Sequence, residues 1–317
     1  MPRRTPGRDL LLVEGAPALV VGTRRALCPR SVQAIWSKQP LALAVRVAVG
    51  SRHHNEAVNV DRLLIAGDLH ANTGVAFEVI DHAARVGADL ILQLGDLGYW
   101  PDDLQGRNFL RKVEKRLALR GLDLWWIDGN HEDFDRLTAL PVGGDGRRQI
   151  SAHVWHLPRG HRWQWGATTW VAVGGAVSVD KNYRTEGKTW FATEELTDEE
   201  ADRIIASGPA DVVVAHDAPL GVPFLRRQLG QDKPAWRRES PWPAGLLMRS
   251  DEHQRRIRRV VEGVRATQVF HGHHHIRYTD SLAAAHGAVV IEGLGMDLNP
   301  PPARRLLVDG TGSPIQE

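Results

Sequence analysis

The feature that most constrains this chain is a repeated pattern in which a short apolar run ends in a cluster of Asp, Asn, His and Gly. Three such runs stand close together, at residues 63–66, 90–94 and 122–127. Their length and their content of Leu and Ile predict buried β-strands. Apolar residues repeat at helical spacing between the strands, and Gly121 stands where the second helix must end. Strands that alternate with helices predict βαβ crossovers and a largely parallel sheet.

The second half of the chain continues this alternation. Residues 169–173, 211–215 and 268–270 are predicted strands. The segment from Thr197 to Glu200 has the spacing of a capping box, which opens a helix. Together with the first half, these elements predict an α/β domain.

A later helix is expected to begin at Ser250, which can act as its cap, and to turn Ile257, Val260 and Val261 inward. Its outward face carries Arg255, Arg256, Arg258 and Arg259. Such a run can contact nucleic acid. Neighbouring polar residues interrupt any continuous basic patch, so a solvated helix face is the favoured interpretation.

Composition limits the partners and the kinds of metal ligand. The 40 basic and 38 acidic residues nearly balance, so composition indicates no nucleic-acid partner. Cys28 is the single cysteine, which excludes an intramolecular disulfide and a thiolate-rich metal site and fits a cytoplasmic protein. No apolar run approaches the roughly 18 residues that a membrane helix needs, because Glu14 and Arg46 interrupt the longest two.

Residues 1–60 differ in texture from the rest of the chain. They mix Arg, Pro and Gly with short apolar runs and show no sustained period of 3.6 or 2. We predict a poorly ordered extension, or a start codon placed too far upstream; the alternative is an arm that binds a partner. Glu14 shortens the apolar segment after the basic start, which disfavours a signal peptide. Residues 61–317 are expected to form the principal domain.

Polar side chains suited to metal binding follow the carboxyl ends of the predicted strands, where ligands bind in open α/β sheets. These side chains are Asp68, His70, Asp96, Asn130, His131, His216, His273 and His275. Oxygen ligands mixed with neutral imidazoles suit Mn²⁺, Fe²⁺ or Zn²⁺ better than Ca²⁺. Two such ions about 3.5–4 Å apart would polarise a phosphoryl oxygen and lower the pKa of a bridging water. They would share a carboxylate, for which Asp96 is the natural candidate.

Each polar cluster alone is a weak signal, but five of them occur in one order, each after a strand. In that order they resemble the calcineurin-like metallophosphoesterase superfamily over roughly residues 61–297. The motifs are Gly67-Asp68-Leu69-His70, Gly95-Asp96-Leu97-Gly98, Gly129-Asn130-His131-Glu132, Ala215-His216-Asp217 and Gly272-His273-His274-His275. The resemblance implies central β-sheets packed as a β-sandwich and flanked by helices, with residues 61–317 as the metallophosphoesterase domain.

The resemblance also implies a site with two divalent metal ions. Asp68, His70 and His275 would hold the first ion, Asn130, His216 and His273 the second, and Asp96 would bridge them. Mn²⁺ is the expected metal, with Fe²⁺, Zn²⁺ or Ni²⁺ as alternatives. His131 would lie beside the substrate phosphate, where it stabilises the transition state or protonates the leaving oxygen.

Residues 174–184 are rich in glycine and then in charge, and they are similar to a loop that bacterial and phage members place over the metals. Arg184 is expected to bind a phosphate oxygen, and it suits this role better than Lys181 because its planar fork matches phosphate geometry. The alternative is a surface loop with ordinary ion pairs. Tyr99 and Trp190 are interpreted as packing residues.

The expected function is hydrolysis of phosphomonoester or phosphodiester bonds through a hydroxide that bridges the metals. Serine/threonine protein phosphatases are disfavoured because Leu97-Gly98-Tyr99 follows Asp96 where they have Val-Asp-Arg. Tyr99 matches the spacing of purple acid phosphatases, but these lack a histidine at the position of His70. A metal-dependent nuclease of the same superfamily stays open. A non-catalytic scaffold is disfavoured because the ligands and His131 are complete.

Overall fold

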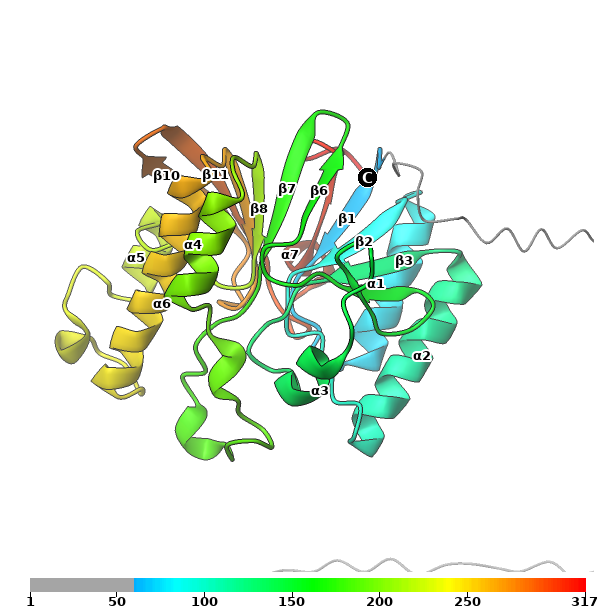
Figure 1. Ribbon diagram of the computed structural model, residues 1–317, viewed down its shortest axis with the longest axis horizontal. Helices are drawn as coiled ribbons and strands as arrows, with labels where there is room; N and C mark the ends of the chain where they lie inside the picture. The colour runs from blue at the N-terminus through cyan, green and yellow to red at the C-terminus, as the bar shows by residue number, and fades with distance from the viewer. Residues whose placement is uncertain (1–59) are drawn as a thin grey trace, which may run out of the picture. The chain divides into compact units, whose positions relative to one another are not determined.

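The computed structural model describes residues 60–317. Two six-stranded sheets form its centre. Figure 1 shows helices α1 and α2 on the outer face of one sheet and helices α4 and α6 on the outer face of the other. This is the expected arrangement of two mixed sheets flanked by helices. The extension predicted at residues 1–60 lies, apart from Val60, outside the described residues and stays a prediction.

The first sheet has the strand order β12-β1-β2-β3-β5-β4. Its parallel centre consists of β1 (Leu63–Ala66), β2 (Leu90–Gln93), β3 (Asp123–Trp126) and β5 (Val154–His156). The antiparallel edges are β12 (Arg305–Val308) and β4 (Arg148–Gln149). Helices α1 (Thr73–Arg85) and α2 (Leu104–Arg120) are the predicted crossovers. Gly121 ends α2 with a φ of 66°, the left-handed conformation that glycine adopts at helix ends.

The second sheet has the order β10-β11-β9-β8-β7-β6. Its parallel centre consists of β11 (Gly287–Gly293), β9 (Gln268–His271), β8 (Val212–Ala215) and β7 (Thr168–Val173). The edges are β10 (Tyr278–Ala284) and β6 (Arg162–Trp165). The main helices are α4 (Asp198–Ala206) and α6 (Ala244–Gly263). The short helices are α3 (Phe134–Ala139), α5 (Pro223–Gln228), α7 (Pro301–Arg304), η1 (Lys181–Tyr183), η2 (Ala192–Glu194) and η3 (Ala235–Arg237).

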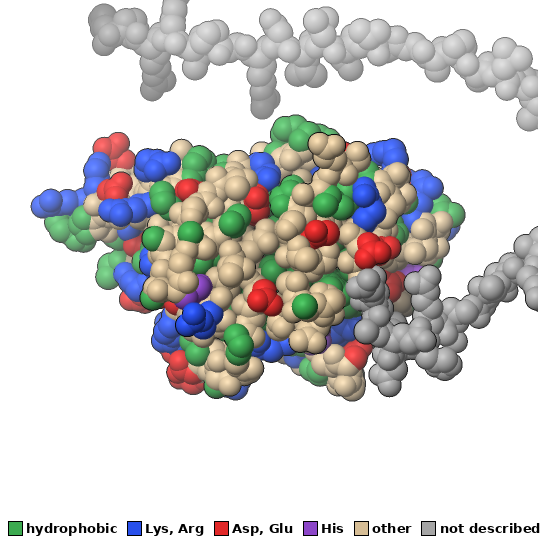
Figure 2. Space-filling view, turned by 90° about the horizontal axis from the view of Figure 1, so that it is seen from above, with side chains coloured by type: hydrophobic (Ala, Val, Ile, Leu, Met, Phe, Trp, Pro, Cys, Tyr) green, Lys and Arg blue, Asp and Glu red, His purple; other side chains and the backbone are tan. Residues whose placement is uncertain are grey.

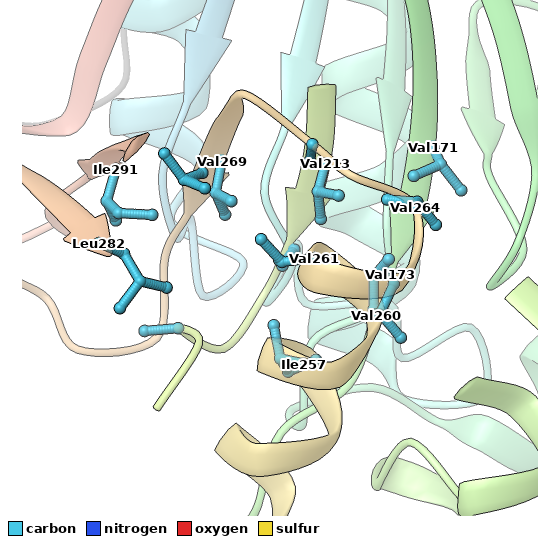
Figure 3. Close-up of a cluster of buried hydrophobic side chains, with 14 of the residues drawn as sticks. Val171, Val173, Val213, Ile257, Val260, Val261, Val264, Val269, Leu282 and Ile291 are labelled. Carbon is cyan, nitrogen blue, oxygen red and sulfur yellow. The ribbon is translucent and has the colours of Figure 1, made fainter. Parts of the chain in front are cut away.

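The apolar runs are continuous because both faces of each sheet are buried. In β1, Leu63 and Ile65 face the layer between the sheets, whereas Leu64 packs against α1 and α2. In β8, Val213 packs toward Val260 and Val261 of α6, and Figure 3 shows this layer. Alternating side chains therefore enter different apolar layers, as parallel strands covered on both sides require. The ends of the strands are thereby fixed in position.

Two predictions about helix starts have opposite outcomes. The capping box is present: Thr197 accepts the backbone N–H of Glu200, and the Glu200 carboxylate accepts that of Thr197. The prediction that Ser250 caps a helix is wrong, because α6 already begins at Ala244, after Pro243. Pro243 precedes the first helical residue with an extended ψ of 142°, and the Leu-Leu-Met stretch that follows continues the helix past Ser250.

The arginine run on α6 is largely occupied by contacts within the protein. Arg256 and Arg259 pair with Asp198, and Arg258 pairs with Glu262. Figure 2 shows Lys and Arg interspersed with Asp and Glu on the face it presents, rather than gathered into one basic area. These pairs agree with a solvated helix face.

Among residues 60–317, no helix combines the length and the apolar character needed to cross a membrane.

Candidate metal centre

The carboxyl ends of strands from both sheets meet at one edge and bring the predicted ligands together. Four of these residues, His70, Asp96, His273 and His275, have positive φ angles of 44°, 55°, 62° and 59°. A non-glycine residue in this conformation costs on the order of 1–3 kcal/mol and persists only where its surroundings hold it. Backbone strain is thus concentrated at the predicted metal ligands.

Asp68, His70 and His275 form one compact ligand group. One ligand atom from each lies within 4.8 Å of the others, as a shared metal ion requires. The Nε2 atom of His275 is 3.1 Å from Oδ2 of Asp68. These are the three residues predicted for the first metal.

Asp96 lies between the two halves of the cluster, and its two carboxylate oxygens have different partners. Oδ1 accepts the backbone N–H groups of Asn130 and His131, both at 2.8 Å. Oδ2 lies 3.4 Å from Nε2 of His70 and 3.4 Å from Nε2 of His216. One oxygen is therefore held by the backbone, and the other faces a histidine from each predicted site.

The residues predicted for the second metal also lie together. Nε2 of His216 is 3.2 Å from Oδ1 of Asn130, and the rings of His216 and His273 are 5.2 Å apart. Nδ1 of His216 donates to the carbonyl of Leu94 at 2.7 Å, so Nε2 is the ring nitrogen that a metal can bind once its proton has left. His216 also forms a second ligand group with Asp68 and Asp96.

Two glycines of the motifs make room for ligands of other motifs. A Cβ atom on Gly129 would lie 2.1 Å from Oδ1 of Asp96, and one on Gly272 would lie 2.2 Å from Oδ1 of Asp68. Real Cβ atoms do not approach other heavy atoms this closely. The ligand side chains occupy the space that a side chain at either glycine would need.

The sequence alone assigned no role to several residues that orient the ligands. Asp297 accepts from His70 Nδ1 at 3.0 Å and from Asn72 Nδ2 at 2.8 Å. The buried carboxylate of Glu132 accepts the N–H groups of Leu97 and Tyr99, which joins the third motif to the second. Such outer contacts fix the tautomer and direction of metal ligands. The chain carries no local signal for Asp297, because its partners lie more than 200 residues away.

Asn130 is held from behind by a chain of hydrogen bonds. Its Nδ2 donates to Oγ of Ser178 at 3.1 Å, and that hydroxyl donates to Glu194 at 2.7 Å. An amide whose nitrogen is bound in this way presents its oxygen in the opposite direction, toward His216. The sequence contains no motif that marks Ser178 or Glu194.

His131 and Arg184 lie in contact beside the ligands. A terminal nitrogen of the Arg184 guanidinium is 2.7 Å from Nε2 of His131, which is 4.0 Å from Oδ2 of Asp96. Burial lowers the pKa of His131 and Arg184 lowers it further, whereas Asp96 acts in the opposite direction. Arg184 also pairs with Asp180 at 2.7 Å. Arg184 thus makes an ion pair, as a residue of an ordinary surface loop would, and it also contacts His131 at the predicted site.

The other side chains singled out near the site pack elsewhere. Lys181 lies over the ring of Trp190, 3.6 Å from its centroid, so its ammonium does not join Arg184. Tyr99 is buried against Trp126, and burial raises its pKa to about 12. These contacts agree with the interpretation of Tyr99 and Trp190 as packing residues.

A cavity of about 550 Å³ lies elsewhere, lined by α5, η3 and α6, and includes none of the predicted ligands. Arg226 and Arg238 in its lining already pair with Asp232 and Asp251. This cavity is thus separate from the Asp and His cluster.

The ligand cluster contains an ionised carboxylate and protonated histidines. Burial acts to lower the pKa values of His70 and His216, but the carboxylate of Asp96 raises them to about 9 and about 10. Burial also acts to raise the pKa of Asp96, yet His216 and His131 hold it well below its ordinary value. A carboxylate that attracts protons this strongly onto its neighbours fits divalent cations, which would replace those protons.

Comparison with known proteins gives one family and several distant structures. The family model described as calcineurin-like phosphoesterase matches residues 61–277. No curated protein matches. The protein TT1561 of Thermus thermophilus is 10% identical with a TM-score of 0.44, and the match covers 79% of this chain and 99% of that one. A dimetal phosphatase from Danio rerio is 10% identical with a TM-score of 0.44, and the match covers 79% and 93%.

We predict that metal binding releases protons. At pH 7, which is below both pKa values, His70 and His216 are protonated, and these protons must leave before the imidazoles can bind a metal. Loading chelator-stripped protein with Mn²⁺ should release about two protons per two-metal centre, one from each histidine, and the apparent affinity should rise with pH between about 7 and 10. A pH-stat titration measures both. Loading without proton release would contradict the charges assigned to this cluster.

Proposed function

This chain belongs to the calcineurin-like phosphoesterase family, and we propose that it is a dinuclear enzyme that hydrolyses phosphomonoesters or phosphodiesters. The observation that carries the proposal is the position of Asp96. Its Oδ2 lies 3.4 Å from a histidine nitrogen of each ligand group. A carboxylate oxygen in that position suits a ligand shared by two cations, and its negative charge reduces their repulsion.

The seven ligands would divide between two ions. Asp68, His70 and His275 would hold one, Asn130, His216 and His273 the other, and Asp96 both. When bound, the ions polarise a phosphoryl oxygen and make a water nucleophilic near neutral pH. Mn²⁺ is the proposed metal, with Fe²⁺, Zn²⁺ and Ni²⁺ as alternatives, because mixed oxygen and imidazole ligands accept several borderline ions.

Arg184 is the proposed phosphate-binding residue. Its guanidinium is almost buried and is oriented by Asp180 through two nitrogens, at 2.9 and 2.7 Å. A guanidinium oriented in this way loses less conformational freedom when it binds an anion. It would bind a phosphoryl oxygen next to His131, and it would counter negative charge that builds up in the transition state.

His131 is the proposed proton donor to the leaving oxygen. Its backbone N–H is fixed by Asp96, while its ring points past that carboxylate toward Arg184. This arrangement would keep the ring beside a bound phosphate, and it leaves the ring outside the ligand groups. The protonated imidazole, which its lowered pKa makes a stronger acid, would give its proton to a departing alkoxide, as general acid catalysis requires.

The experiment that tests the function uses chelator-stripped protein. We expect no turnover of bis-p-nitrophenyl phosphate, p-nitrophenyl phosphate, cyclic nucleotides or short DNA until Mn²⁺ is restored. The substrate that then reacts fastest distinguishes a monoesterase, a diesterase and a nuclease. Equal turnover in excess chelator would contradict metal dependence, and a fully loaded protein without turnover on every substrate would favour a scaffold.

Asp96→Asn should be the most damaging ligand change, because it weakens both sites and removes the shared negative charge. Metal content per chain and kcat should both fall further than in Asp68→Asn, which changes a ligand of the first metal alone. Asp123→Asn, at the start of β3 and away from the ligands, serves as a control with the same chemical change. If Asp96→Asn keeps two metals and a near-normal rate, the bridging assignment is wrong.

His131→Gln should keep both metals but slow the enzyme in a way that depends on the leaving group. The rate should fall about 10²–10⁴-fold for an alkyl or nucleoside ester. It should fall much less for a nitrophenyl ester, because nitrophenolate leaves without a proton. His286→Gln, at the β10–β11 hairpin, is the control. Similar losses on both esters would mean that His131 stabilises phosphoryl charge instead, and lost metal would make it a ligand.

A further inference from the structure

His274 stands between two predicted ligands, His273 and His275, and belongs to neither ligand group. Its side chain points to the buried carboxylate of Asp217, and Nε2 is 3.0 Å from Oδ1. Because a carboxylate only accepts hydrogen bonds, this nitrogen carries the proton and donates it. No sequence pattern assigns a role to His274.

Asp217 is a fully buried carboxylate held by donors from three parts of the chain. Its oxygens accept from the N–H of Ala218 at 2.7 Å, His253 Nδ1 at 2.9 Å, His274 Nε2 at 3.0 Å and Gln254 Nε2 at 3.2 Å. A buried carboxylate is tolerated only when hydrogen bonds replace its lost water. The four donors meet this need and fix the direction of each oxygen.

His253, a residue of α6, fixes the position of the Asp217 carboxylate. Its Nε2 accepts the backbone N–H of Leu196 at 3.1 Å, so the ring proton is on Nδ1, which faces Asp217. Since both ring nitrogens are used, the ring has one orientation. Asp217 is therefore anchored to a helix that packs against the second sheet.

The hydrogen bond between His274 and Asp217 joins the two segments that carry three predicted ligands. Asp217 directly follows His216, and His274 lies between His273 and His275. The φ angles of 62° and 59° at His273 and His275 are unfavourable without support. A side chain anchored at the middle of the turn supplies that support.

We propose that His274 and Asp217 are positioning residues that hold the histidine turn in its metal-binding conformation. The inference rests on the proposed metal centre but assigns neither residue to it as a ligand. A purely structural role would lower stability without changing metal affinity in the folded protein. A positioning role changes the affinity itself, because the unanchored turn must be ordered each time a metal binds.

The test compares His274→Ala with His274→Gln in the full chain. Mn²⁺ binding is measured by calorimetry and by electron paramagnetic resonance, and folding is measured by circular dichroism. The Ala variant should bind Mn²⁺ about 10–100-fold more weakly, as is typical when an outer partner of a metal site is lost. The Gln variant should recover most of the affinity, because its side-chain amide can still donate to Asp217.

His153→Ala is the matched control, because His153 pairs with Asp123 at 2.8 Å, beside the start of β3 and away from the ligands. It should leave Mn²⁺ affinity unchanged. Wild-type affinity in a folded His274→Ala would overturn the proposal. If that variant does not fold, Asp217→Asn is tested instead. This change keeps the shape of the side chain but replaces an acceptor oxygen with a donor nitrogen. Unchanged Mn²⁺ affinity in this variant would overturn the proposal.

The same measurements separate this inference from the proposed function. If the wild type binds no Mn²⁺, the metal centre itself is wrong and the positioning role falls with it. If the wild type binds Mn²⁺ and all the variants bind it equally well, only the positioning role is wrong.

Discussion

The geometry of the site depends on one buried carboxylate, that of Asp96. Removing a carboxylate from water costs several kcal/mol unless other groups replace the hydration. Here the backbone of the third motif binds one oxygen, and imidazoles from both sheets face the other. The close approach of Gly129 and the positive φ of Asp96 both follow from placing that carboxylate at the centre. The Asp96 carboxylate binds groups from several motifs, and these groups replace the water that it loses on burial.

The sheets give this arrangement its precision. The ligands stand within a few residues of strand ends, so their positions are fixed by the packing of the two sheets. The layer between the sheets includes Trp170 and Phe270, whose rings stack at 5.9 Å with an interplanar angle of 4°. Tightly packed interiors resist small displacements. A metal site shared by two sheets therefore depends on apolar side chains that never contact the metal.

The sequence predicted the strands, and it picked out side chains that the fold brings together as candidate ligands, because both predictions depend on local patterns. An apolar run predicts a buried strand, and a polar cluster after it predicts a place at the sheet edge. The residues that orient the ligands left no such pattern. Asp297 and the pair Asp217 and His274 act on partners distant in the sequence, so only the folded chain reveals them. The start of α6 was misplaced because Ser250 resembles a cap, although the helix already begins at Ala244.

The segment that carries Arg184 is attached to the metal centre at both of its ends. Ser178 accepts a hydrogen bond from Asn130, and Leu196 donates one to His253, which in turn binds Asp217. Arg184 lies between these two attachments. If Arg184 binds the phosphate as proposed, changes within residues 179–195 would alter which phosphoester is accepted while the attachments to the proposed ligands stay intact. The proposed metal ligands follow regular strands, whereas the segment with the proposed phosphate-binding residue is mostly irregular. The part that must be precise is thus separate from the part that can vary.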